Sequence, residues 1–237
     1  MSSPTDGCSA LRIALLEDDT VLRTRVLLPG LANFGFVATG METAAELLDR
    51  LKSETFDIVV LDVGLPDADG FTVARQIRDE SPATGIVMLT GRGTTPDRVR
   101  GLSQGADAYL TKPIEIDLLA ATLHSLARRL GGEERRAPTR DWHMDRDGWC
   151  LVSPGGGVVA LTKTERRLVE RLILCRGQLV ARDVLIAALT SNVYDFDPHR
   201  LDSLVYRLRR KVADGCSDAF PLQAVHGEGY VLRSACA

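Results

Sequence analysis

The first half of the chain carries polar residues capable of chemistry at the ends of four short apolar segments. In chain order they are Glu17 with Asp18 and Asp19, then Asp62, then Thr90, then Lys112. Carboxylates gathered in one place repel one another unless a hard cation lies among them, and Mg²⁺ prefers oxygen ligands. A neighbouring ammonium and hydroxyl suit a further anion such as a phosphoryl group. The pattern therefore predicts a phosphoryl-transfer site with a carboxylate nucleophile.

Each of these residues also has a plainer interpretation. An acid that follows a strand is more often a solvated loop residue or a helix cap. Polar residues after four separate strands are harder to explain in that way. In a parallel α/β sheet the carboxyl ends of the strands meet at one edge, and ligands bind there. The chemistry thus depends on the elements that position these residues.

Short apolar segments alternate with helical patterns over residues 1–130. The expected strands are Leu11–Leu16, Phe36–Ala38, Ile58–Leu61, Ile86–Leu89 and Ala108–Leu110. The expected helices, with apolar residues at helical spacing, are Thr20–Leu28, Thr43–Leu51, Phe71–Arg78, Pro96–Gln104 and Ile116–Leu130. Five strands, each followed by a helix, predict an α/β domain with a doubly wound parallel five-stranded sheet.

Residues 131–140 combine two glycines, a proline and charges of both signs without apolar periodicity, which is typical of a linker. Residues 141–237 then show a different, α+β pattern. Short strands are expected at Trp142–Met144, Trp149–Val152 and Val158–Leu161, and a hairpin at Leu222–Val225 and Tyr230–Arg233. Helices are expected from the capping box Thr162–Glu165 to about Cys175, over Val180–Leu189 and over Pro198–Ala213.

The last of these helices has two faces. Its apolar stripe consists of Leu201, Leu204, Val205, Leu208 and Val212. Its polar side consists of Arg200, Ser203, Tyr206, Arg207, Arg209 and Arg210. A helix buried on one side can enter the major groove, where arginine donates two hydrogen bonds to a guanine edge. For an isolated helix, a merely solvated basic face is the commoner explanation.

Composition limits the class of protein. The 237 residues, 45% hydrophobic and 26% charged, fit two small globular domains. The net charge of −3 is unevenly spread: residues 1–130 hold 13 Lys/Arg against 18 Asp/Glu, and residues 131–237 hold 16 against 14. No stretch resembles a membrane span or a secretory signal, and the five scattered cysteines favour free thiols. We therefore expect a cytoplasmic protein without membrane contact.

The signature residues of the first half resemble the receiver domain of two-component response regulators. The blocks are Leu15-Leu16-Glu17-Asp18-Asp19, Val60-Leu61-Asp62-Val63-Gly64-Leu65-Pro66, Met88-Leu89-Thr90-Gly91 and Tyr109-Leu110-Thr111-Lys112-Pro113. The resemblance implies that Asp62 accepts a phosphoryl group from the phosphohistidine of a sensor histidine kinase. Mg²⁺ would be held by Glu17, Asp18, Asp62 and the backbone carbonyl of Gly64. Thr90 would hydrogen-bond the phosphoryl group, Lys112 would pair with it, Tyr109 would be the switch aromatic, and Lys112–Pro113 would be a cis peptide bond.

A second class of protein also begins its chemistry at an aspartate, the haloacid-dehalogenase-like phosphatases. Those enzymes use a second aspartate two positions on as a general acid, and this chain has Gly64 there. Without that proton donor, a slowly decaying aspartyl phosphate fits better than turnover. We expect no enzyme beyond self-catalysed phosphoryl transfer and slow dephosphorylation.

The second half resembles the OmpR/PhoB-type winged-helix DNA-binding domain. The resemblance rests on Leu161–Glu165, Gly177–Val180, Leu201–Lys211 and Val225–Tyr230. It places Ser203, Tyr206 and Arg207 nearest the bases, Arg200, Arg209 and Arg210 at phosphates or groove edges, and His226 at the tip of the wing. The family commonly has arginine where His226 stands, and Glu228 follows. We expect weaker wing affinity that rises at lower pH, and tighter binding after His226→Arg.

A second departure concerns dimerisation, which in the family uses a charged lattice. Arg98 and Asp107 are present, but Ala108, Leu118 and Thr122 replace an aspartate, a glutamate and an arginine. Exposed ion pairs stabilise by only about 0–1 kcal/mol each. We therefore expect a more apolar contact between copies, which could form even before phosphorylation.

The sequence thus predicts a response regulator in which phosphorylation at Asp62 favours a homodimer that binds double-stranded promoter DNA. Thr190–Asp197 is a candidate contact for RNA polymerase. The alternative is a transcription factor that uses its receiver as a phosphorylation-independent dimerisation scaffold. The complete acidic constellation argues against that alternative.

Overall fold

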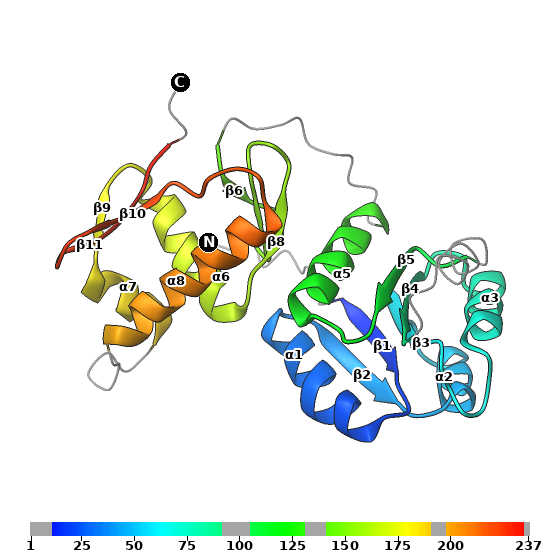
Figure 1. Ribbon diagram of the computed structural model, residues 1–237. Coiled ribbons are helices and arrows are strands. Elements are labelled where there is room, and N and C mark those ends of the chain that lie inside the picture. Colours follow the sequence, from blue (N-terminus) through cyan, green and yellow to red (C-terminus); the bar gives the residue numbers. More distant parts are fainter. Residues whose placement is uncertain (1–10, 92–104, 131–140, 191–197, 235–237) are drawn as a thin grey trace, which may run out of the picture. The chain divides into compact units, whose positions relative to one another are not determined.

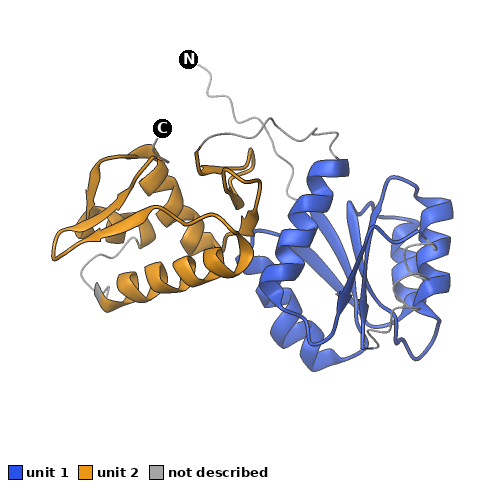
Figure 2. Ribbon diagram, turned by 45° about the horizontal axis from the view of Figure 1, so that its top comes forward, with its two compact units in different colours: residues 1–134 blue, residues 135–237 orange. Residues whose placement is uncertain are grey.

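The computed structural model describes residues 11–91, 105–130, 141–190 and 198–234. The chain divides into two compact units, residues 1–134 and 135–237 (Figure 2). The expected linker 131–140, the expected helix Pro96–Gln104 and residues 191–197 of the candidate polymerase contact lie outside the described residues. Within the described ranges, no helix has the length and apolar character needed to cross a membrane.

The first unit contains one five-stranded sheet in the order β2-β1-β3-β4-β5, and every pairing in it is parallel. The strands are β1 (Arg12–Leu16), β2 (Val37–Met41), β3 (Ile58–Asp62), β4 (Gly85–Thr90) and β5 (Ala108–Thr111). The residues of β3 and β4 are buried along their whole length, as expected for central strands covered on both faces. The predicted doubly wound α/β architecture is confirmed.

Helices cover both faces of this sheet, with α1 and α5 on one side and α2 and α3 on the other (Figure 1). Their bounds are α1 (Leu28–Asn33), α2 (Ala44–Leu51), α3 (Gly70–Glu80) and α5 (Ile116–Leu130). Side chains of α2 and α3 form one core with β1, β3 and β4. The sheet edge at which the strands end is left for polar residues.

The helical segment after β1 extends further than the sequence predicts. A π-helical segment, η1 (Leu22–Leu27), leads directly into α1, so the segment ends at Asn33 and not at Leu28. Pro29 lies at the start of α1, directly after the π-helical residues, and the helical segment continues past it. The Pro-Gly pair therefore does not end the helical segment here.

The start of α3 lies close against the end of β3. A Cβ on Gly70 would lie 2.7 Å from the carbonyl oxygen of Asp62 and 2.7 Å from the Cα of Val63. Only glycine allows this approach, because backbone atoms cannot give way as a flexible side chain can. Asp69 caps the helix by accepting a hydrogen bond from the N–H of Phe71. The contact fixes the backbone that carries Asp62.

The second unit has two small antiparallel sheets with helices between them in the sequence. The sheets are ordered β6-β7-β8 and β10-β11-β9. Their strands are β6 (His143–Met144), β7 (Cys150–Val152), β8 (Val158–Ala160), β9 (Leu179–Ala181), β10 (Leu222–Val225) and β11 (Gly229–Leu232). The helices are α6 (Lys163–Leu174), α7 (Arg182–Leu189) and α8 (Pro198–Gly215). This is the predicted winged-helix arrangement, with β10 and β11 as the wing hairpin.

Local sequence signals set the helices of this unit. The capping box at α6 is present, with Thr162 accepting from the N–H of Glu165 and Glu165 accepting from the N–H of Thr162. The apolar stripe of α8 is buried in one core with α6, α7 and the wing strands, as the spacing predicts. That stripe is Leu201, Leu204, Val205, Leu208 and Val212.

The expectation of a helix over Val180–Leu189 was wrong at its start. Val180 lies in β9, which pairs with β11, and α7 begins only at Arg182. A Cβ on Gly229 would lie 2.0 Å from the carbonyl oxygen of Val180, so the two strands approach closely at a glycine. Because β9 pairs with the wing strand β11, Val180 and Ala181 lie in a strand and not in α7.

Candidate functional site

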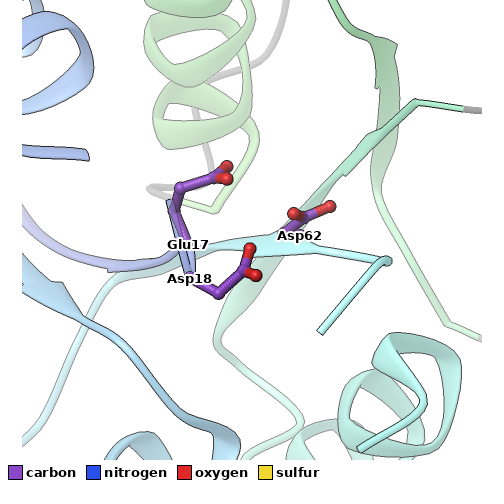
Figure 3. A group of neighbouring side chains, drawn as sticks. All are labelled: Glu17, Asp18 and Asp62. Carbon is purple, nitrogen blue, oxygen red and sulfur yellow. The ribbon is translucent and has the colours of Figure 1, made fainter. Parts of the chain in front are cut away.

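Three carboxylates meet at the carboxyl ends of β1 and β3 (Figure 3). Glu17 and Asp18 directly follow β1, and Asp62 is the last residue of β3. One carboxylate oxygen from each lies within 4.8 Å of the others. Glu17 is 0% exposed and Asp62 4% exposed, so the charges are largely removed from water. The predicted acidic cluster therefore exists in the folded chain.

Lys112, which follows β5, reaches into this cluster. Its Nζ donates hydrogen bonds of 2.7 Å to Oε1 of Glu17 and 2.7 Å to Oδ2 of Asp62. Its backbone N–H donates to the carbonyl oxygen of Thr90, and the bond to Pro113 is cis, as expected. One ammonium thus bridges carboxylates from two different strands.

The shared charges shift the proton equilibria of this group. Burial raises the pKa of Glu17, and nearby Asp62 raises it further, while the hydrogen bond from Lys112 acts in the opposite direction. Burial alone would lower the pKa of Lys112, but its hydrogen bonds to Asp62 and Glu17 outweigh burial and raise the pKa. The lysine therefore stays an ammonium cation that compensates the two acids.

The donor set fits a divalent cation. Oε2 of Glu17 is buried and accepts no hydrogen bond from the described residues, although the Lys112 ammonium lies 2.7 Å away. Three carboxylates against one ammonium leave negative charge uncompensated at the site. Hard cations with oxygen ligands, Mg²⁺ above all, match this combination. Glu17, Asp18 and Asp62 are the residues able to hold such an ion.

The other residues singled out in the sequence lie at the same sheet edge or beside it. Thr90 is the buried last residue of β4, whose neighbour in the sheet is β3. The N–H of Gly64 donates to Oδ1 of Asp62 at 3.0 Å. Tyr109 is half-buried in β5, and its hydroxyl is buried with no hydrogen bond to any described residue. The sheet therefore places a hydroxyl, a backbone donor and an aromatic ring around the acidic cluster.

The second group of candidate residues lies on α8 and in the wing. Arg200, Ser203, Tyr206, Arg207 and Arg210 are exposed, and the side chain of Tyr206 is among the most exposed large apolar groups at 66%. Arg209 differs from them, because it is half-buried and donates a hydrogen bond to the carbonyl oxygen of Leu222. His226 is exposed in the turn between β10 and β11.

A polar clasp that the sequence did not reveal joins α8 to its neighbours. Arg182 at the start of α7 donates two hydrogen bonds of 2.9 Å to the carboxylate of Asp202 on α8. Tyr230 in β11 donates a third, of 2.6 Å. These bonds lower the pKa of Asp202 and raise that of Arg182. Burial raises the pKa of Tyr230, and the hydrogen bond to Asp202 raises it further. The available signal was Asp202, the single acid within the expected basic helix Pro198–Ala213.

A second residue that the sequence did not reveal is Arg23 in η1. It is buried, and its guanidinium donates to the carbonyl oxygen of Glu17. The available signal was its spacing of four residues from Leu27, and of eight from Leu31, which are both buried. An arginine on the apolar stripe of a helix needs polar partners inside the protein.

The face formed by β5 and α5 bears the departures noted in the sequence. Asp107 is already bound within the unit, by Arg78 at 2.7 Å and by Arg129 at 3.3 Å. Leu118 on α5 is 52% exposed, and the hydroxyl of Thr122 donates to the carbonyl oxygen of Leu118. Arg98 lies outside the described residues. The described part of this face is therefore less charged than a lattice of ion pairs requires.

Comparison with known proteins gives similarities for both units. Residues 13–124 match the sequence profile described as "Response regulator receiver domain", and residues 156–232 match "Transcriptional regulatory protein, C terminal". The chain is 33% identical over 229 residues to "Two-component response regulator PhoP" of Pseudomonas aeruginosa, which covers 95% of this chain and 100% of the relative. It is 31% identical over 224 residues to "Cell cycle response regulator CtrA" of Brucella ovis, covering 94% of this chain and 96% of that one.

A solved structure resembles the first unit. It is the CheY-like response regulator receiver domain protein of Methanospirillum hungatei, with 27% sequence identity and a TM-score of 0.50. The match covers 53% of this chain and 100% of that one. The similarity of fold thus concerns a receiver domain, whereas the similarity of sequence extends over both units.

Proposed function

Because this chain belongs to the OmpR/PhoB-type family of two-component response regulators, with a receiver domain and a DNA-binding domain, we propose that phosphorylation of Asp62 controls its binding to promoter DNA. The observation that carries the proposal is the bridging of Glu17 and Asp62 by Lys112 beside Asp18. A buried carboxylate with a compensating ammonium and a cation-binding pair is suited to accept a phosphoryl group.

The proposed transfer begins at a phosphohistidine of a sensor kinase. A carboxylate oxygen of Asp62 forms the new P–O bond while the P–N bond of the donor breaks, and the histidine nitrogen keeps the electron pair and takes up a proton. Mg²⁺ held by Glu17, Asp18, Asp62 and the carbonyl of Gly64 would supply charge neutralisation at the phosphoryl oxygens. Positioning and charge compensation are most of what such a transfer needs from the protein.

Three further residues respond to the new charge. Lys112 exchanges one of its carboxylate contacts for a phosphoryl oxygen, and the hydroxyl of Thr90 donates to another. Tyr109, whose buried hydroxyl lacks a hydrogen bond to any described residue, is then free to adjust its position at the β5 surface. Phosphorylation shifts an existing equilibrium, because the phosphoryl group interacts differently with the two states.

The state favoured by phosphorylation is proposed to be a homodimer. Asp107 is occupied within the unit and Leu118 is exposed, so we propose an apolar contact through the β5 and α5 face. A dimer presents two α8 helices to tandem sites in double-stranded DNA and so multiplies affinity through effective concentration. Ultracentrifugation of the full chain should then show self-association that weakens strongly in Leu118→Glu, with Val37→Glu, at the exposed first residue of β2, as control.

We propose that the protein is a switch with no turnover of a substrate. Gly64 offers no carboxylic acid two positions after Asp62, so the site lacks the second acid of a phosphatase of the haloacid-dehalogenase type. Its only chemistry would be its own phosphorylation and slow dephosphorylation.

The test compares DNA binding by the wild-type chain and Asp62→Ala, each with and without Mg²⁺ and a small-molecule phosphodonor. Tighter binding of the wild type after donor treatment, with a mass increase of one phosphoryl group, supports the proposal. Asp62→Ala should show neither change. Equal binding in all four samples, with no mass increase, would indicate the phosphorylation-independent scaffold instead.

A further inference from the structure

Arg23 is a buried cation next to the acidic cluster without belonging to it. Its Nη1 donates to the carbonyl oxygen of Glu17, and the carbonyl oxygen of Asp18 lies 3.5 Å from the same nitrogen. Its Nη2 donates to Oε2 of Glu42 at 2.9 Å and lies 3.4 Å from Oγ1 of Thr20. The guanidinium thus contacts the backbone of both residues that follow β1.

The surrounding fold leaves room for this side chain. A Cβ on Gly40 in β2 would lie 3.1 Å from Cδ and 3.2 Å from Cγ of Arg23, which is tighter than an ordinary contact. Glycine at this position therefore allows the arginine stem to pass beside β2 toward the end of β1. Glu42, which follows β2, then meets the far side of the guanidinium.

The ion pair with Glu42 does not by itself explain the burial of Arg23. The Glu42 side chain is 60% exposed, and pairs with an exposed partner stabilise by about 0–1 kcal/mol. The contacts with fixed geometry are those to the backbone carbonyls after β1. A planar guanidinium with several donors is suited to hold two carbonyls and a carboxylate at once.

We propose that Arg23 is a positioning residue for the cation site. Through the carbonyls of Glu17 and Asp18 it fixes the backbone that aims their two carboxylates at the ion, and through Glu42 it ties that backbone to the end of β2. The inference rests on the proposed function of the acidic cluster. Removal of a residue that holds a metal ligand in place commonly lowers metal affinity by about 10- to 100-fold.

The test measures cation binding directly, without phosphorylation. Mn²⁺ is the probe because it shares the oxygen preference of Mg²⁺. Electron paramagnetic resonance of free Mn²⁺ gives its affinity for the full chain, and competition gives that of Mg²⁺. Arg23→Met should bind about 10-fold more weakly than wild type. Glu42→Gln should lose about 2- to 3-fold, because only the second anchor is weakened.

Arg25→Met is the matched control, since Arg25 lies on the same segment and is exposed. It should bind Mn²⁺ as the wild type does. Wild-type affinity in Arg23→Met would overturn the positioning role, even if the variant melted at a lower temperature. If Arg23→Met does not fold, Arg23→Lys and Glu42→Gln replace it, and wild-type affinity in both would overturn the inference. Absence of Mn²⁺ binding by the wild type would instead overturn the proposed function, and the inference with it.

Discussion

Glu17 and Asp62 are buried and share one ammonium, whereas the residues of α8 that are expected to meet DNA stand exposed. In the first unit the buried carboxylates are compensated in part by Lys112 within the protein. In the second, the exposed face is held by residues behind it, chiefly the clasp of Arg182, Asp202 and Tyr230.

This difference has a physical origin. A buried charge is costly without a partner, so the acidic cluster carries its compensating group even without an ion. An exposed arginine keeps most of its hydration, so its charge costs little in the folded protein. Removing a buried charged group should therefore lower the stability of the first unit. In the second unit, stability should depend mainly on the residues that support the exposed face of α8.

The largest loss of stability is expected at Gly229, where β11 leaves no room for a side chain beside β9. Gly229→Ala would put a Cβ 2.0 Å from the carbonyl oxygen of Val180, so β9 and β11 must separate. We expect a loss of roughly 4 kcal/mol or more in unfolding free energy. Both tryptophans lie in this unit, so denaturation followed by tryptophan fluorescence reports on it alone.

Gly227→Ala is the control within the same wing. Unlike Gly229, Gly227 has a positive φ, of 73°, and nothing lies within 4 Å of its Cβ position. It should lose only about 1–2 kcal/mol, the cost of left-handed backbone. Equal losses in the two variants would show that the close approach of β9 and β11 is unimportant.

Lys112→Met tests the buried site. Without the ammonium, the Glu17 and Asp62 carboxylates face each other uncompensated, and we expect about 3 kcal/mol of destabilisation in a chelator. Added Mg²⁺ should restore much of it, because an ion that binds only the folded state stabilises it. Thermal unfolding by circular dichroism measures both effects.

The exposed lysine Lys52, which pairs with Asp49 at 3.5 Å, provides the comparison. Lys52→Met should change stability by less than about 1 kcal/mol, with no dependence on Mg²⁺. A Lys112→Met chain as stable as this control would contradict the view that the ammonium compensates the acids.

Histidines sharpen the contrast between the two units. His124 on α5 is 5% exposed, and its ring lies 4.3 Å from that of Phe36. Burial, aided by the charge of Arg128, lowers the pKa of His124 from 6.5 to about 4, against a backbone hydrogen bond with Phe34. The unfolded chain therefore takes up the proton first as pH falls.

The stability that His124 confers is complete above pH 6.5 and is lost as pH falls toward 4. The loss amounts to about 3 kcal/mol. His124→Phe should remove this part of the pH dependence, which urea denaturation across that range would measure. His226→Phe, in the exposed wing turn, is the matched control for the change of residue type.

The smallest effect is expected at the clasp. Tyr230→Phe removes one hydrogen bond to Asp202, and we expect a loss of about 1 kcal/mol in unfolding free energy. Tyr206→Phe, which changes an exposed tyrosine on α8, should lose nothing measurable. Tryptophan fluorescence during urea denaturation measures the stability of both variants. Equal stability would show that the hydrogen bond from Tyr230 to Asp202 does not stabilise the second unit.

The sequence revealed the acidic cluster because parallel strands bring their ends to one edge. Asp62 and Lys112 could be assigned to that edge because each follows a predicted strand of a parallel sheet. Arg23 could not, because its partners are mainly backbone carbonyls, which every sequence contains. Val180 was assigned to a helix because its three-residue strand exists only through pairing with β11, some fifty residues away. Non-local contacts of this kind leave no local pattern.

Two of the five basic residues of α8 are turned toward the protein. Lys211 pairs with the buried Glu165 at 3.0 Å, and Arg209 donates to the Leu222 carbonyl. Only Arg200, Arg207 and Arg210 remain as exposed cations on the helix. Each phosphate neutralised releases condensed counterions, so Arg200 and Arg210, which are expected at phosphates, would contribute about −2 to the slope of log affinity against log salt. The internal contacts of α8 thereby limit how strongly ionic strength governs its attachment to DNA.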